Sequence, residues 1–81
     1  MPFQIQAIYG LKDEWTQSEL LKWLKEHDFF PIKDAHMKGD EIRYRIRDPT
    51  YTSYITKKIM VYLKYATYNK HRNVYFVLGK T

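Results

Sequence analysis

Hydrophobic and polar residues alternate along residues 3–9, and this period of two is typical of a β-strand with one buried face. The pattern places Gln4 and Gln6 on the solvent-facing side of the strand. The core side receives the apolar residues at odd positions, which are Phe3, Ile5, Ala7 and Tyr9. Ile8 fits this alternation less well, because it shares the outer side with the glutamines.

Residues 41–47 alternate strictly and predict another strand. Its hydrophobic side carries Ile42, Tyr44 and Ile46. Its opposite side carries Arg43, Arg45 and Arg47. The turn residues Lys38-Gly39-Asp40 predict a hairpin that joins this strand to a β-prone stretch at 29–36, where Pro31 favours an edge position. Asp48-Pro49 ends the strand, and a last short apolar strand follows at 74–78.

A helix is predicted from Thr16 to His27 by a start signal and by the spacing of its apolar residues. Thr16 and Glu19 have the spacing of a capping box, in which each side chain bonds a free backbone N–H of the first turn. Trp15 and Leu20 are placed for a hydrophobic staple across the same turn. One side of the helix then carries Leu20, Trp23, Leu24 and His27.

Residues 50–68 fit two structures. Helical spacing is present among apolar and aromatic residues, namely Tyr51, Tyr54, Ile55, Ile59, Tyr62, Leu63 and Ala66. Residues 59–68 are also rich in β-branched and aromatic residues, and a turn-like stretch at 69–73 follows them, as in a hairpin. The first interpretation gives a β-α-β-β-α-β ferredoxin-like order, and the second gives one helix on an antiparallel sheet of about five strands. Both are α+β with one sheet face covered by helix, and we favour the ferredoxin-like order.

The composition limits what the chain can be. With 81 residues it has room for a single domain, 1–81, and for no deep substrate cavity. The absence of cysteine excludes disulfides, thiolate catalysis and cysteine-based zinc sites. No signal peptide is recognisable and no apolar run approaches about 18 residues, so we expect an intracellular protein without a membrane partner.

Charge is distributed unequally between the two halves of the chain, within a net charge of +5. Residues 1–41 carry five lysines against eight carboxylates, whereas residues 42–81 carry nine lysines and arginines against Asp48 alone. Such asymmetry favours a polyanionic partner or an acidic surface of another protein. A solvated basic face that keeps the protein in solution has the same composition.

The arginines of the 41–47 strand are the strongest candidate site. Alternate residues of a strand lie about 7 Å apart, close to the spacing of successive phosphates on nucleic acid. Guanidinium groups bind phosphate bidentately, and an exposed tyrosine at position 75 would stack on a base. We expect nucleic-acid contact by Arg43, Arg45, Arg47, Lys57, Lys58, Tyr75, Gln4 and Gln6. The alternative is that these residues only form the solvated side of the sheet or pair with carboxylates.

Catalytic chemistry is not expected from this inventory. Ser18 and Ser53 lie in no nucleophile motif, and no glycine-rich phosphate loop is present. Acidic and histidine side chains cluster near the predicted hairpin turn, but without the convergent pattern of a metal site: Asp34, His36, Asp40 and Glu41. We therefore expect a protein that is not an enzyme and that uses no metal or cofactor.

The order of short motifs along the chain resembles short modules encoded by tailed phages and giant DNA viruses. The matching stretches are Ile5-Gln6-Ala7-Ile8, Trp23-Leu24-Lys25, Arg43-Tyr44-Arg45-Ile46-Arg47-Asp48-Pro49, Thr56-Lys57-Lys58-Ile59 and Val74-Tyr75-Phe76-Val77-Leu78-Gly79. Asp28 departs from the pattern, because those modules tend to have glycine after the helix. The resemblance implies a viral origin, and hence a place in the host cytoplasm or the virion, but no activity.

The sequence thus favours a non-enzymatic, virus-encoded module that contacts DNA or RNA, with little sequence specificity, through a basic sheet face. The alternative function is a virion component or a host-protein interaction module. Its anchors would be the arginines and four tyrosines, Tyr51, Tyr54, Tyr62 and Tyr65, because tyrosine and arginine are frequent hot-spot residues. Exposed β-edges would also support a homo-oligomer formed by strand addition.

Overall fold

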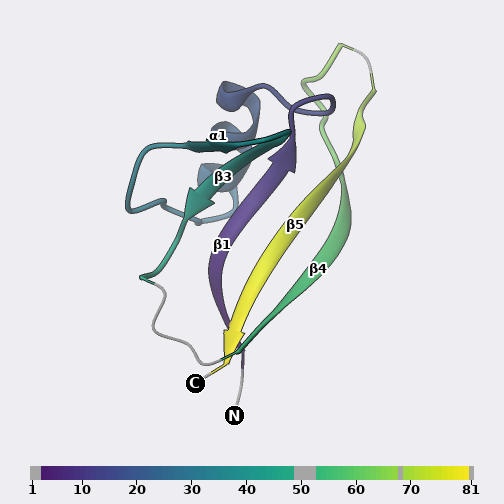
Figure 1. The fold of residues 1–81 in the computed structure, drawn as a ribbon. Helices are drawn as coiled ribbons and strands as arrows, with labels where there is room; N and C mark the ends of the chain where they lie inside the picture. The colour runs from purple at the N-terminus through teal and green to yellow at the C-terminus, as the bar shows by residue number, and fades with distance from the viewer. Residues whose placement is uncertain (1–2, 49–52, 68, 81) are drawn as a thin grey trace.

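One helix packs on one face of a five-stranded antiparallel sheet in the computed structural model, which describes residues 3–48, 53–67 and 69–80 (Figure 1). The elements in chain order are β1 (Gln4–Leu11), α1 (Gln17–Glu26), β2 (His36–Lys38), β3 (Glu41–Arg45), β4 (Ser53–Tyr62) and β5 (His71–Lys80). The strands lie side by side in the order β2-β3-β1-β5-β4. The two edges of the sheet are therefore β2, which is short, and β4, which is long.

The predicted α+β class is confirmed, but the favoured ferredoxin-like order is wrong. Residues 53–62 form β4 and pair with β5 along their whole length, so no second helix is present there. The segment fits both periods, because Ile55 and Ile59 share one side of a strand and are also four residues apart, as on one face of a helix. β-Branched residues lose less side-chain freedom in a strand, and pairing with β5 decides the outcome. Tyr51 lies outside the described residues.

A β-bulge in β1 changes the side on which its later residues lie. The register against β5 shifts between Ile5 and Ala7, and as a result both Ile5 and Ile8 face the helix. Ile8 is fully buried in the core, whereas Tyr9 stacks on Tyr75 on the other face. The predicted core position of Tyr9 is therefore wrong, and Ala7 is buried on the face opposite the helix. The extra residue at the bulge explains why Ile8 did not fit a strict alternation.

The hydrophobic core lies between α1 and the sheet. The helix contributes Leu20, Trp23 and Leu24. The strands contribute Ile8, Ile42, Tyr44, Val74 and Phe76. Trp15 precedes the helix and joins this core, and a Cβ atom on Gly10 would come within 2.5 Å of its ring, so only glycine fits beneath it. Phe3, which the alternation places in the core, is 40% exposed.

The helix begins and ends where the sequence predicts. The hydroxyl of Thr16 accepts from the backbone N–H of Glu19, and the Glu19 carboxylate accepts from the N–H of Thr16, which completes the capping box. Asp28 follows the last turn in the left-handed region, with φ of 63°. The N–H of Phe29 donates to the carbonyl of Leu24 at 2.8 Å, as in a Schellman motif. Asp28 thus occupies the conformation for which glycine is the usual residue.

The hairpin at residues 36–45 is confirmed, but its first strand is shorter than expected. Gly39 adopts a positive φ of 57° in the turn between β2 and β3. Of the β-prone stretch 29–36, only His36 belongs to a strand, although the N–H of Ile32 still donates to the carbonyl of Arg45 at 2.9 Å. The second strand ends at Arg45 rather than at position 47, and the last strand is longer than the predicted 74–78.

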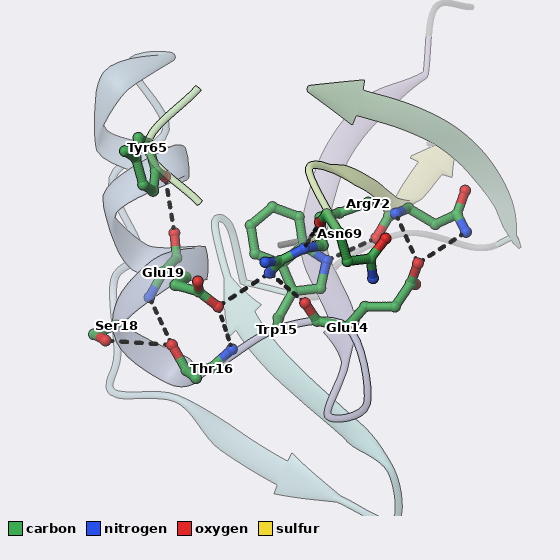
Figure 2. Close-up of polar contacts among 9 residues, drawn as sticks. Glu14, Trp15, Thr16, Ser18, Glu19, Tyr65, Asn69 and Arg72 are labelled. Carbon is green, nitrogen blue, oxygen red and sulfur yellow. Dashed lines mark hydrogen bonds and ion pairs between the residues drawn. The ribbon is translucent and has the colours of Figure 1, made fainter. Parts of the chain in front are cut away.

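A buried arginine ties the helix to the distant end of the sheet (Figure 2). The side chain of Arg72, at the start of β5, is 3% exposed. It pairs with the Glu19 carboxylate at 3.0 Å and donates to the backbone carbonyls of Glu14 and Asn69. Beside it, the indole N–H of Trp15 donates to the carbonyl of Asn73 at 2.9 Å. Segments 53 to 58 residues apart in sequence are thereby joined by one cluster of polar contacts.

Replacing Arg72 by methionine (Arg72→Met) should lower the free energy of unfolding by about 3 kcal/mol, because buried acceptors lose their donor. Urea unfolding followed by tryptophan fluorescence measures the change. Lys58→Met is the control, since Lys58 is exposed on β4 and the same kind of exchange there should stay within about 0.5 kcal/mol. Equal effects of the two substitutions would show that the buried contacts of Arg72 do not stabilise the fold.

The contact between Glu19 and Arg72 also makes the stability of the fold depend on pH. Hydrogen bonding to Arg72 is the main cause that lowers the pKa of Glu19 below its usual value of 4.5, with help from the backbone of Thr16. A carboxyl group whose pKa is lowered by folding stabilises the protein fully above about pH 4.5 and loses that contribution as the pH falls through the folded-state pKa. Glu19→Gln should therefore lower stability at pH 7 and flatten its decline below pH 4.5 in urea unfolding. An unchanged acid decline would contradict the pairing.

Candidate functional site

The face of the sheet opposite α1, called the open face here, carries one row of side chains that crosses every strand of the described chain. Backbone registers place five residues opposite one another, in the order His36, Arg43, Tyr9, Tyr75 and Lys58. Neighbouring strands are about 4.8 Å apart, so the row is roughly 19 Å long. His36 and Lys58 lie at the two ends of the row, and Arg43 lies beside His36. The two tyrosines lie between Arg43 and Lys58.

The centre of the row is a stack of one guanidinium group and two phenol rings. The rings of Tyr9 and Tyr75 are nearly parallel, with centroids 4.7 Å apart. The guanidinium carbon of Arg43 lies 4.7 Å from the Tyr9 centroid, in a cation–π contact. Burial, followed by the charge of Glu41, raises the pKa of Tyr9, so its phenol stays neutral and can donate a hydrogen bond. The stack thus places the guanidinium group of Arg43 against the Tyr9 ring of the central strand, β1.

Glu41 is the one carboxylate among the described strand residues that project from the open face. Its oxygen lies 2.7 Å from Nε of Arg43, two residues along β3. Both side chains are about one third exposed, with 31% for Arg43 and 28% for Glu41. An anionic ligand would compete with Glu41 for the guanidinium group of Arg43.

Arg45 is the second cation of β3 on this face. It lies opposite Ala7 and forms no ion pair within residues 3–48, 53–67 and 69–80. Beside it the surface has a hollow of about 280 Å³ that Lys33 and His36 also line, with Asp34 as its acidic member. The hollow therefore holds more basic than acidic groups, as an anion site requires.

The open face brings together most of the residues that the sequence identifies as candidates. Arg43 and Arg45 project from β3, Tyr75 from β5 and Lys58 from β4. Gln4 lies on the same face, opposite Gly79, near the end of β1. These five side chains come from four strands, and sheet pairing places them on one face.

Three other candidates lie outside the row. Lys57 is opposite Phe76 and thus projects from the helix side of the sheet. Gln6 lines the hollow beside Arg45 but is buried at the bulge, where its side-chain amide donates to the carbonyl of Arg47 at 3.3 Å, so it is not the solvent-exposed residue that the alternation predicts. Arg47 is exposed but follows the end of β3. None of the three belongs to the row.

Sequence reasoning missed Tyr9 and His36 as members of the site. A strict alternation assigns Tyr9 to the core, and only the poor fit of Ile8 indicated that the strand changes sides. His36 is drawn beside Arg43 by the β2–β3 hairpin, whose turn was recognisable from Gly39. Arg72, in contrast, counts toward the basic half of the sequence but contributes nothing to the surface, because it is buried.

The tyrosines of the alternative hypothesis do not form one surface. Tyr54 and Tyr62 are exposed on the open side of β4, at 44% and 55%. Tyr65 instead packs against the helix, where Nζ of Lys22 lies 4.1 Å from its ring centroid and its hydroxyl donates to the carbonyl of Glu19. Tyr51 is outside the described residues.

Within the described part of the chain, no group of three or more histidine or acidic side chains is arranged to hold a metal ion. None of its helices has the length and apolar character needed to cross a membrane. Comparison with protein-family models, with curated proteins and with solved structures gave no match to this chain.

Proposed function

We propose that this chain is a virus-encoded, non-enzymatic module that binds the phosphate backbone of nucleic acid on its open face. The observation that carries the proposal is the row of His36, Arg43, Tyr9, Tyr75 and Lys58 across the sheet. The viral part rests on the resemblance of the chain's short motifs to phage and giant-virus modules.

Cations on this face are spaced for a nucleic-acid strand. Arg43 and Arg45 are alternate residues of β3 and lie about 7 Å apart along it, near the spacing of successive phosphates. Lys58 lies three strand spacings from Arg43, at about 14 Å, on the other side of the tyrosines. A strand that crosses the sheet can thus contact a cation on each side of the stack.

The aromatic stack limits how bases are bound. One face of the Tyr9 ring is covered by Arg43 and the other by Tyr75, so Tyr9 offers only its edge and hydroxyl group. Tyr75 has one ring face engaged by Tyr9, and its other face, toward Lys58, is the place for a single stacked base. Affinity therefore comes mainly from phosphate contacts, which carry little sequence information.

Two kinds of alanine variant test this proposal by fluorescence anisotropy with labelled single- and double-stranded DNA and RNA at several salt concentrations. Arg43→Ala/Arg45→Ala should weaken binding and flatten the log–log salt slope by about 1.5 to 2 units, because two phosphate contacts are lost. Lys58→Ala should flatten it by about 1 unit. Circular dichroism confirms that each variant is folded.

Lys57→Ala is the matched control for Lys58→Ala. The two lysines are adjacent and exposed on β4, but Lys57 lies on the helix side of the sheet. Lys57→Ala changes the net charge by the same amount as Lys58→Ala and should leave the salt slope unchanged. Equal effects of the two substitutions would mean that binding follows net charge rather than the open face, and absence of binding by the wild type at low salt would overturn the proposal.

Glu41→Gln should strengthen binding, and no folding defect can imitate this result. The substitution removes the carboxylate that pairs with Arg43 at 2.7 Å and takes a negative charge from the open face. We expect an affinity increase of roughly threefold to tenfold at low salt, with a steeper salt slope, in the same anisotropy titration. Weaker or unchanged binding would show that Arg43 does not contact the phosphates.

A further inference from the structure

Among the described strands, β4 is a long edge strand that pairs on one side only. β4 runs from Ser53 to Tyr62, contains neither proline nor glycine, and pairs with β5 on one side only. The opposite edge of the sheet, β2, has only three residues. Natural proteins keep edge strands short, or place proline, bulges or charged residues such as lysine in them, because the outward N–H and C=O groups of an edge bind another strand. Only Lys57 and Lys58 interrupt the apolar and neutral residues of β4.

The helix side of β4 is also apolar and uncovered. Figure 1 shows α1 toward the β3 side of the sheet and β4 at the other margin. Ile55 and Ile59 project on this side and are 40% and 46% exposed. Beside them a shallow groove of about 240 Å³ is lined by Ile5, Phe29, Phe76 and Leu78 together with Ile59 and Lys57. A partner strand along β4 would bury Ile59 and close this groove at its open side.

We propose that two copies of this chain associate through antiparallel pairing of β4 with β4, about a two-fold axis at Ile59. An extended backbone is the partner that pairs with the outward N–H and C=O groups of an edge strand, here those of residues 56–62. The same strand in a second copy offers the matching free edge and the matching apolar side, as a two-fold interface requires.

The two-fold axis restricts the register. Directly opposite residues of an antiparallel pair project on the same face of the sheet. In a pair related by a two-fold axis, the residue at the axis therefore lies opposite the same residue of the second copy. An axis at position 57 or 58 would place lysine against lysine, which is unfavourable. An axis at Ile59 places Lys57 opposite Val61 and Lys58 opposite Met60 of the second copy, and pairs residues 56–62. It also brings the two Ile59 side chains together.

Such a dimer has one continuous sheet with both helices on the same side. The open faces of the two copies then lie side by side, and their basic rows form one longer surface. Pairing through β4 uses the backbone edge and the helix side, so it occurs whether or not the open face binds nucleic acid.

Light scattering coupled to gel filtration, across a wide range of protein concentrations, tests the association. The wild type should shift from monomer to dimer by mass action. Ile59→Lys places lysines against each other at the axis and should keep the protein monomeric. Ile32→Lys is the matched control, because Ile32 is an isoleucine of similar exposure, 50%, outside β4, and this variant should still dimerise. A wild type that stays monomeric throughout overturns the proposal.

Disulfide trapping tests the register, since the chain has no cysteine of its own. Ile59→Cys places two thiols opposite each other at the axis, with Cβ atoms about 5 Å apart, and mild oxidation should give a covalent dimer. Ile55→Cys lies on the same side of β4 with similar exposure, but its two copies are on the order of 25 Å apart in this register and should not cross-link. Equal cross-linking of both variants, or of neither, overturns the Ile59-centred pairing.

Discussion

The arrangement of helix and sheet depends on the buried guanidinium group of Arg72. It joins the first turn of α1 through Glu19, the loop before the helix through the carbonyl of Glu14, and the turn before β5 through the carbonyl of Asn69. These segments are adjacent only in the folded chain. Because a buried charge without partners is costly, losing any of these contacts would destabilise the arrangement in which α1 packs on one face of the sheet.

With α1 on that face, the candidate site lies on the opposite face of the sheet. The bulge in β1 determines what this face contains, since it turns Ile8 into the core and Tyr9 out of it. Tyr9 then lies between Arg43 and Tyr75 and connects the basic strand β3 with β5. A single extra residue in one strand therefore creates the aromatic centre of the candidate site, as bulges often do by re-aiming side chains.

The two adjacent lysines of β4 illustrate how a strand separates charges that are neighbours in sequence. Lys58 joins the row on the open face, whereas Lys57 borders an apolar groove on the helix side. The proposed nucleic-acid binding and the proposed self-association would thus use different surfaces of the same strand. In the proposed dimer the edge of the sheet would be covered and the basic face doubled, which increases the number of phosphates that one assembly contacts.

The sequence by itself determined the helix with its capping box, the Gly39 hairpin turn and the alternation that separates Ile42 and Tyr44 from Arg43 and Arg45, because these depend on residues close in the chain. It did not decide whether β4 is a helix or a strand, because the spacing of Ile55 and Ile59 satisfies both periods. The tertiary structure alone decided that β4 pairs with β5, that Tyr9 faces outward and that Arg72 is buried. Each of these outcomes depends on partners far away in the sequence, whose positions no local pattern contains.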